Sequence, residues 1–165
     1  MVKKRSNTHI ESVSNFGATA RIAPIGLQNF AADFLAGAKA IPPPNVTFAP
    51  TQPYLVCHAL ELALKAFLSL KEYPLDKLSG GKFGHDLENL LDEAERQGLD
   101  DLVKFDERQK FQIRRASQYY WSKAFEYPAV VELMSGNPEM PSTAILIEIT
   151  ETLVAALREP RINAR

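Results

Sequence analysis

A polar face on an otherwise apolar stretch is the first place where this sequence could do chemistry. His58, Glu61 and Lys65 follow one another at steps of three and four residues, so a helix places them on one side. Lys65 could then hold a phosphate, with Glu61 orienting it. Two structural alternatives remain open. The face lies in solvent, as Ser69 and Glu72 suggest, or Glu61 and Lys65, in the favourable i, i+4 order, form a buried ion pair.

A second polar pair, His85 and Asp86, follows the glycine-containing segment 79–84. With His58, Glu61 and Lys65, this pair completes the set of ligand-binding candidates, and His85 is the one candidate catalytic residue. The alternative for this pair is a turn and a helix cap, because Asp suits a helix start. The three histidines and the single cysteine are too few and too scattered for a closed zinc site, so we expect no metal and no cofactor.

A basic segment offers candidates for contacts with nucleic acid. Residues 104–123 carry six Lys and Arg against two Asp and Glu, and Tyr119, Tyr120 and Trp121 lie among them. Arginines beside stacking aromatics suit single-stranded nucleic acid, so Arg108, Arg114 and Arg115 are the candidates. The alternative is an ordinary solvated helix face whose aromatic residues belong to the core.

Composition places the chain among ordinary globular proteins. It has 165 residues, 45% of them hydrophobic and 24% charged, which favours one domain with a substantial core. The formal net charge of -1 gives no overall field that would attract nucleic acid or an anionic membrane. One cysteine and the lack of a long apolar run or a secretory leader predict a cytoplasmic protein that is not held in a membrane.

Apolar residues at helical spacing predict an all-α protein, a single helical bundle of about five helices. The expected helices are 24–40, one that begins with Thr51 as N-cap, 86–97, 101–125 as one helix or two, and 144–157 capped by Ser142 or Thr143. Residues 1–23 lack apolar periodicity and are expected to form a flexible N-terminal arm, which leaves residues 24–160 for the bundle.

Two strings in this order resemble the HEPN family of small helical-bundle domains. They are His58-Ala59-Leu60-Glu61-Leu62-Ala63-Leu64-Lys65-Ala66-Phe67-Leu68 and, after a loop, Gly84-His85-Asp86-Leu87-Glu88-Asn89-Leu90-Leu91. The later Ala124-Phe125-Glu126-Tyr127-Pro128 is similar to a short ending in the family, with Glu126 where Arg is usual. The resemblance spans roughly residues 52–128 and implies a HEPN-like bundle that assembles as a homodimer.

Many HEPN proteins are metal-independent ribonucleases that use an Arg and a His with four to six residues between them. No such R-x4-6-H pair occurs here, since Arg5 and His9 are one residue too close. The resemblance therefore implies a nucleotide- or RNA-binding domain that is not catalytic and that belongs to a toxin–antitoxin or defence-type system. The alternatives are a protein–protein interaction module with a protein partner and a divergent metal-independent ribonuclease that uses His85.

Overall fold

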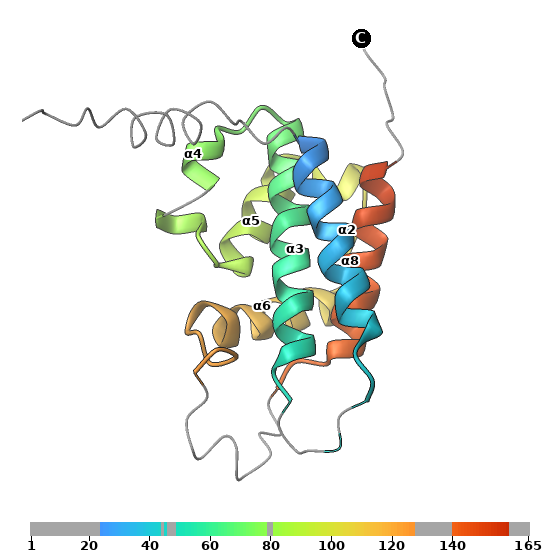
Figure 1. Ribbon diagram of the computed structural model, residues 1–165. Helices are drawn as coiled ribbons and strands as arrows, with labels where there is room; N and C mark the ends of the chain where they lie inside the picture. The colour runs from blue at the N-terminus through green and yellow to red at the C-terminus, as the bar shows by residue number, and fades with distance from the viewer. Residues whose placement is uncertain (1–23, 44, 46–48, 79–80, 128–139, 159–165) are drawn as a thin grey trace, which may run out of the picture.

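The computed structural model describes residues 24–43, 45, 49–78, 81–127 and 140–158, which form helices and no strand. Figure 1 shows them arranged as a bundle, which confirms the predicted all-α fold. The long helices are α2 (Pro24–Ala40), α3 (Thr51–Leu70), α5 (Leu87–Arg96), α6 (Glu107–Trp121) and α8 (Thr143–Arg158). Shorter elements are α4 (Leu75–Leu78) and the 3-10 turns η1 (Gly81–Phe83) and η2 (Leu99–Asp101). The predicted arm, 1–23, lies outside the described residues.

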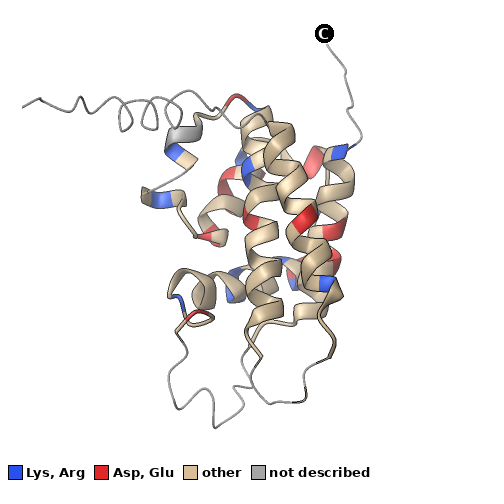
Figure 2. Ribbon diagram, viewed as in Figure 1, with Lys and Arg blue, Asp and Glu red and all other residues tan. Residues whose placement is uncertain are grey.

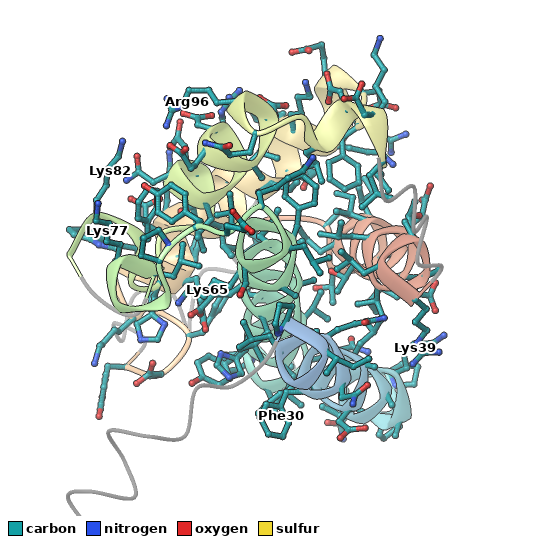
Figure 3. The ribbon with its side chains drawn as sticks, turned by 90° about the horizontal axis from the view of Figure 1, so that it is seen from above. Phe30, Lys39, Lys65, Lys77, Lys82 and Arg96 are labelled. Carbon is teal, nitrogen blue, oxygen red and sulfur yellow. The ribbon has the colours of Figure 1, made fainter. Side chains whose placement is uncertain are left out.

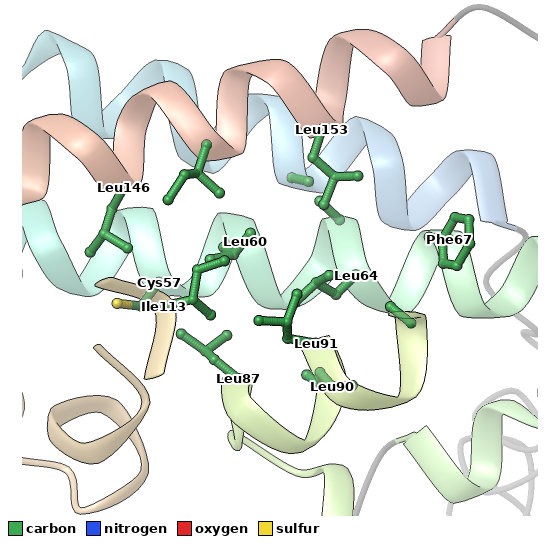
Figure 4. Close-up of a cluster of buried hydrophobic side chains, with 14 of the residues drawn as sticks. Cys57, Leu60, Leu64, Phe67, Leu87, Leu90, Leu91, Ile113, Leu146 and Leu153 are labelled. Carbon is green, nitrogen blue, oxygen red and sulfur yellow. The ribbon is translucent and has the colours of Figure 1, made fainter. Parts of the chain in front are cut away.

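Helix α3 is the central element, because α2, α5, α6 and α8 all contact it. Its side chains Leu60 and Leu64 are fully buried, and they pack with Leu91 of α5 and Leu153 of α8 (Figure 4). By length and composition alone α3 could also cross a membrane, but 67% of its most apolar window is buried inside the protein. Its hydropathy is therefore accounted for by its place in the core.

The start of α3 differs from the expectation by one residue. Pro50, not Thr51, is the N-cap, and no side chain caps the helix there. Pro50 already has helical backbone angles, with φ -73° and ψ -16°, and its carbonyl accepts a 2.9 Å hydrogen bond from the Tyr54 amide. The proline ring presets this φ value, so the helix begins without the hydroxyl cap that was predicted at Thr51.

The predicted short helix at 86–97 is confirmed as α5. Asp86 is its N-cap, and the carboxylate accepts a hydrogen bond of 3.0 Å from the Asn89 amide. The chain leaves the helix at Gly98, whose φ of 87° lies in the left-handed region that glycine adopts without strain.

The segment 101–125 contains one helix, shorter than the longest prediction. Helix α6 begins at Glu107, because Asp106 and Gln109 form a reciprocal capping box that fixes the start. The residues before it form η2 and a non-helical link. Helix α8 extends one residue beyond the predicted span at each end, and the Ser142 hydroxyl accepts a long 3.5 Å bond from the Ile145 amide.

Candidate functional site

The polar face of α3 points into the bundle. The side chains of Glu61 and Lys65 are only 4% and 11% exposed, and their charged groups lie 2.5 Å apart. The Lys65 ammonium also donates a 2.8 Å hydrogen bond to the carbonyl of Gly84, just before α5. Of the two structural alternatives, the buried ion pair is the one observed, and the solvent-facing alternative is wrong for these two residues.

Three more side chains converge on the second oxygen of Glu61. The Tyr120 hydroxyl of α6 donates to Oε2 at 2.6 Å, and His85 Nδ1 lies 3.0 Å from the same atom. His58 Nδ1 lies 3.5 Å from that oxygen and 2.8 Å from the Tyr120 hydroxyl. We call these five residues, Glu61 with Lys65, His58, His85 and Tyr120, the Glu61 cluster.

Donor and acceptor counting fixes the protons of the two imidazoles. The single hydroxyl proton of Tyr120 is used on Glu61, so His58 Nδ1 must carry a proton and donate it to the tyrosine oxygen. An ionised carboxylate only accepts, so His85 Nδ1 must also be a donor. In their neutral forms both histidines therefore keep the lone pair on Nε2, the atom that points away from the carboxylate.

The carboxyl of Glu61 stays ionised despite its burial. Burial by itself raises its pKa, but His58 Nδ1, 3.5 Å away, the hydrogen bond and charge of Lys65 and the Tyr120 hydroxyl together lower the pKa to about 2. Burial, followed by the neighbouring Glu61 charge, raises the pKa of Tyr120 above its usual value of 10.0. The cluster thus holds an anion and a neutral phenol at neutral pH.

The cluster reaches solvent through its histidines. The side chain of His85 is 56% exposed and that of His58 is 25% exposed. The His58 ring packs edge-on against Phe34, with centroids 4.4 Å apart, and lies parallel to Tyr54 at 6.4 Å. Neighbouring rings and a hydrogen bond therefore hold His58, whereas His85 is the most accessible member.

Asp86 does not join the cluster. Its carboxylate caps α5 and also accepts a 3.1 Å hydrogen bond from the Ser117 hydroxyl of α6. The Ser117 oxygen in turn accepts from the Glu88 amide at 3.1 Å. Asp86 thus ties the start of α5 to α6 and holds the neighbouring His85 in place, which is the structural role that was the alternative for this residue.

The three arginine candidates lie on α6 and none is in the cluster. Arg114 pairs with two carboxylates of α5, Asp92 at 3.0 Å and Glu88 at 3.4 Å. Arg108 is exposed, while Arg115 is half-buried and has interactions of its own. Contact of these residues with nucleic acid stays a prediction, and for Arg114 it would compete with existing ion pairs.

Tyr120 is the member of the cluster that the sequence identified only as one of the aromatic residues in the basic segment 104–123. Its hydroxyl was the one indication of a polar contact, because a buried tyrosine usually has a hydrogen-bond partner. Its partner, Glu61, is 59 residues away in the chain, so helical spacing gave no indication of the contact.

Among the residues that the structure describes, no group of three or more His, Cys, Asp or Glu side chains could hold a metal ion. Comparison of the chain with protein-family models, with curated proteins and with solved structures finds no significant match. The fold and the site therefore define the protein as an all-α helical bundle with a buried carboxylate that anchors two histidines.

Proposed function

We propose that this protein binds RNA or a nucleotide by its phosphate at the exposed edge of the Glu61 cluster, as a HEPN-like bundle. The observation that carries the proposal is His85, which is half-exposed while its Nδ1 is bound to Glu61. A protonated His85 would still have its Nε2–H free to donate to a phosphate oxygen.

Lys65 is not the phosphate ligand in this proposal, because its ammonium is buried between Glu61 and the Gly84 carbonyl. Exposed lysines nearby supply the charge instead. Lys82, on η1, precedes His85 by three residues, and Lys77 lies on α4. Lys77 and Lys82 lie on the same side of α3 as Lys65 (Figure 3). In Figure 2 they are the blue segments of α4 and η1.

The test is binding of a fluorescein-labelled single-stranded RNA of ten nucleotides to the full chain, measured by anisotropy. We expect the affinity to fall about tenfold between 50 and 200 mM salt, as for two or three phosphate contacts. His85→Ala and Lys82→Ala should each weaken binding severalfold and reduce the salt slope. Lys39→Ala is the matched control, because Lys39 projects from the opposite side of the bundle (Figure 3).

Two outcomes would contradict the binding proposal. One is the absence of any RNA or 5′-AMP binding at 50 mM salt, and the other is binding that does not depend on salt or on His85. Either result favours the alternative of a protein–protein interaction module. Neutralising Arg108 and Arg115 in a separate variant shows whether the basic segment of α6 adds contacts.

A second candidate, a divergent metal-independent ribonuclease, is favoured by the pair of imidazoles within 3.5 Å of one carboxylate oxygen. In this reaction one Nε2 takes the proton of a ribose 2′-hydroxyl as the 2′-oxygen attacks phosphorus. The bond from phosphorus to the 5′-oxygen breaks, and the other imidazole, protonated, gives that oxygen its proton. The products are a 2′,3′-cyclic phosphate and a 5′-hydroxyl.

For this second candidate we expect the wild-type chain to cleave RNA in the presence of EDTA, because no metal is needed. Each of the single variants His58→Ala and His85→Ala should lose this cleavage. A substrate with a 2′-deoxyribose at the cleavage site should resist, because its nucleophile is missing. The protein is purified free of contaminating nucleases, and the RNA fragments are resolved by gel electrophoresis. If the wild-type chain leaves the RNA intact, the ribonuclease candidate is wrong, and the binding proposal is judged by its own assay.

A further inference from the structure

A cavity of about 570 Å³ opens where the start of α2 meets the ends of α3 and α8 and the turn η2. Figure 1 shows these helix ends together at one end of the bundle. The lining is largely apolar, with Ile25, Phe67, Leu70, Leu102 and Leu157 among its residues. This volume is typical of sites for small organic molecules. The cavity shares no residue with the Glu61 cluster.

A polar side chain of α2 lies among the apolar residues of this lining. Gln28 is only 7% exposed as a residue and lines the cavity. Its amide carries two N–H donors and one acceptor oxygen, so it can form a hydrogen bond with a polar group of a ligand.

The rim of the cavity favours an anion. The charged residues of the lining are two cations, Lys71 and Arg158, and one carboxylate, Asp101. Both cations are exposed, and neither forms an ion pair with any residue in the described ranges. The Lys71 ammonium lies 5.5 Å from the centre of the Phe67 ring, so charge and apolar surface meet at the same point.

We propose that this cavity binds a small amphipathic carboxylate, a molecule with an apolar chain or ring and one acid group. The apolar part would cover Ile25 and Leu70, which are 65% and 57% exposed, and so remove apolar surface from water. The acid group lies at Lys71 and Arg158, and Gln28 donates to an oxygen of the ligand. This site is separate from the proposed RNA site.

Decanoate, used below its micelle concentration, is the probe, and calorimetry with the full chain measures its binding. Ala156 is half-buried and lines the cavity, whereas the adjacent Ala155 is exposed on α8. We expect Ala156→Phe to weaken binding at least tenfold by filling the space, and Ala155→Phe to bind as the wild type does. Bound decanoate should raise the melting temperature of the wild type.

A second pair of variants keeps the test valid if Ala156→Phe does not fold. Leu70→Asp places a like charge at the exposed rim and should abolish decanoate binding, while Phe111→Asp, an exposed site on α6, should not. Lys71→Met should weaken decanoate several-fold and leave binding of decanol, which has no charge, unchanged.

The proposal is overturned if the full chain does not bind decanoate, or if Ala156→Phe and Leu70→Asp bind it like the wild type. Binding that appears only after residues 1–23 or 159–165 are removed also overturns it, because a segment of this chain is then the occupant. Equal loss of decanol and decanoate in Lys71→Met would contradict the assigned role of the charge.

Discussion

Replacing Lys65 with methionine is expected to lower the free energy of unfolding by about 3 kcal/mol, because it leaves a buried carboxylate without its cation. Glu61 is 4% exposed and would keep only its hydrogen bonds to Tyr120 and the histidines. Urea unfolding of the wild type and of Lys65→Met measures this loss.

The matched control for this substitution is Lys39→Met. Lys39 of α2 pairs with Glu151 of α8, but both side chains are about half exposed, at 51% and 43%. Such a surface pair contributes at most about 1 kcal/mol. Comparable losses in Lys39→Met and Lys65→Met would contradict the argument. A double-mutant cycle with Glu61→Gln should show coupling, since the two groups are in contact.

Acid is expected to destabilise the protein in a way that depends on Glu61. Its folded-state pKa of about 2 lies below the ordinary value of 4.5. A lowered carboxyl pKa contributes stability that is fully present above pH 4.5 and is lost as the pH falls toward 2. From this difference, the wild type should lose about 2 kcal/mol more than Glu61→Gln between pH 5 and pH 3.

The measurement is urea unfolding of both proteins at pH 5, 4 and 3. All other carboxyl groups titrate alike in the two chains, so their contributions cancel in the comparison. Parallel curves for the wild type and Glu61→Gln would show that the folded-state pKa of Glu61 is not lowered. Glu93, whose pKa is also lowered, by hydrogen bonds from Gln97 and Arg96, supplies a comparison site outside the Glu61 cluster through Glu93→Gln.

The Glu61 cluster has a consequence for any functional experiment on this protein. Glu61, Lys65 and Tyr120 hold α3, α6 and the start of α5 together, so substituting them changes stability as well as the site. His85 is half-exposed and attached by one hydrogen bond to the carboxylate. It is therefore the position at which function can be changed with the least damage to the fold.

Much of the helical framework was determined by local sequence. Apolar residues at helical spacing predicted the helix 24–40, and Asp86 marked the start of α5. These signals depend on neighbours within about four residues, which is the range of a helical hydrogen bond. The same local reasoning put His58, Glu61 and Lys65 on one face of one helix.

Only the tertiary structure decided which way that face points and what it meets. Spacing alone does not distinguish a solvent-facing position from a buried pair for Glu61 and Lys65, because both give the same i, i+4 pattern. Packing of α6 against α3 brought Tyr120 to Glu61 across 59 residues, and packing of α2 left the amide of Gln28 in a cavity. Helix periodicity fixes which residues share a face, whereas burial of that face depends on distant helices whose contacts no local pattern encodes.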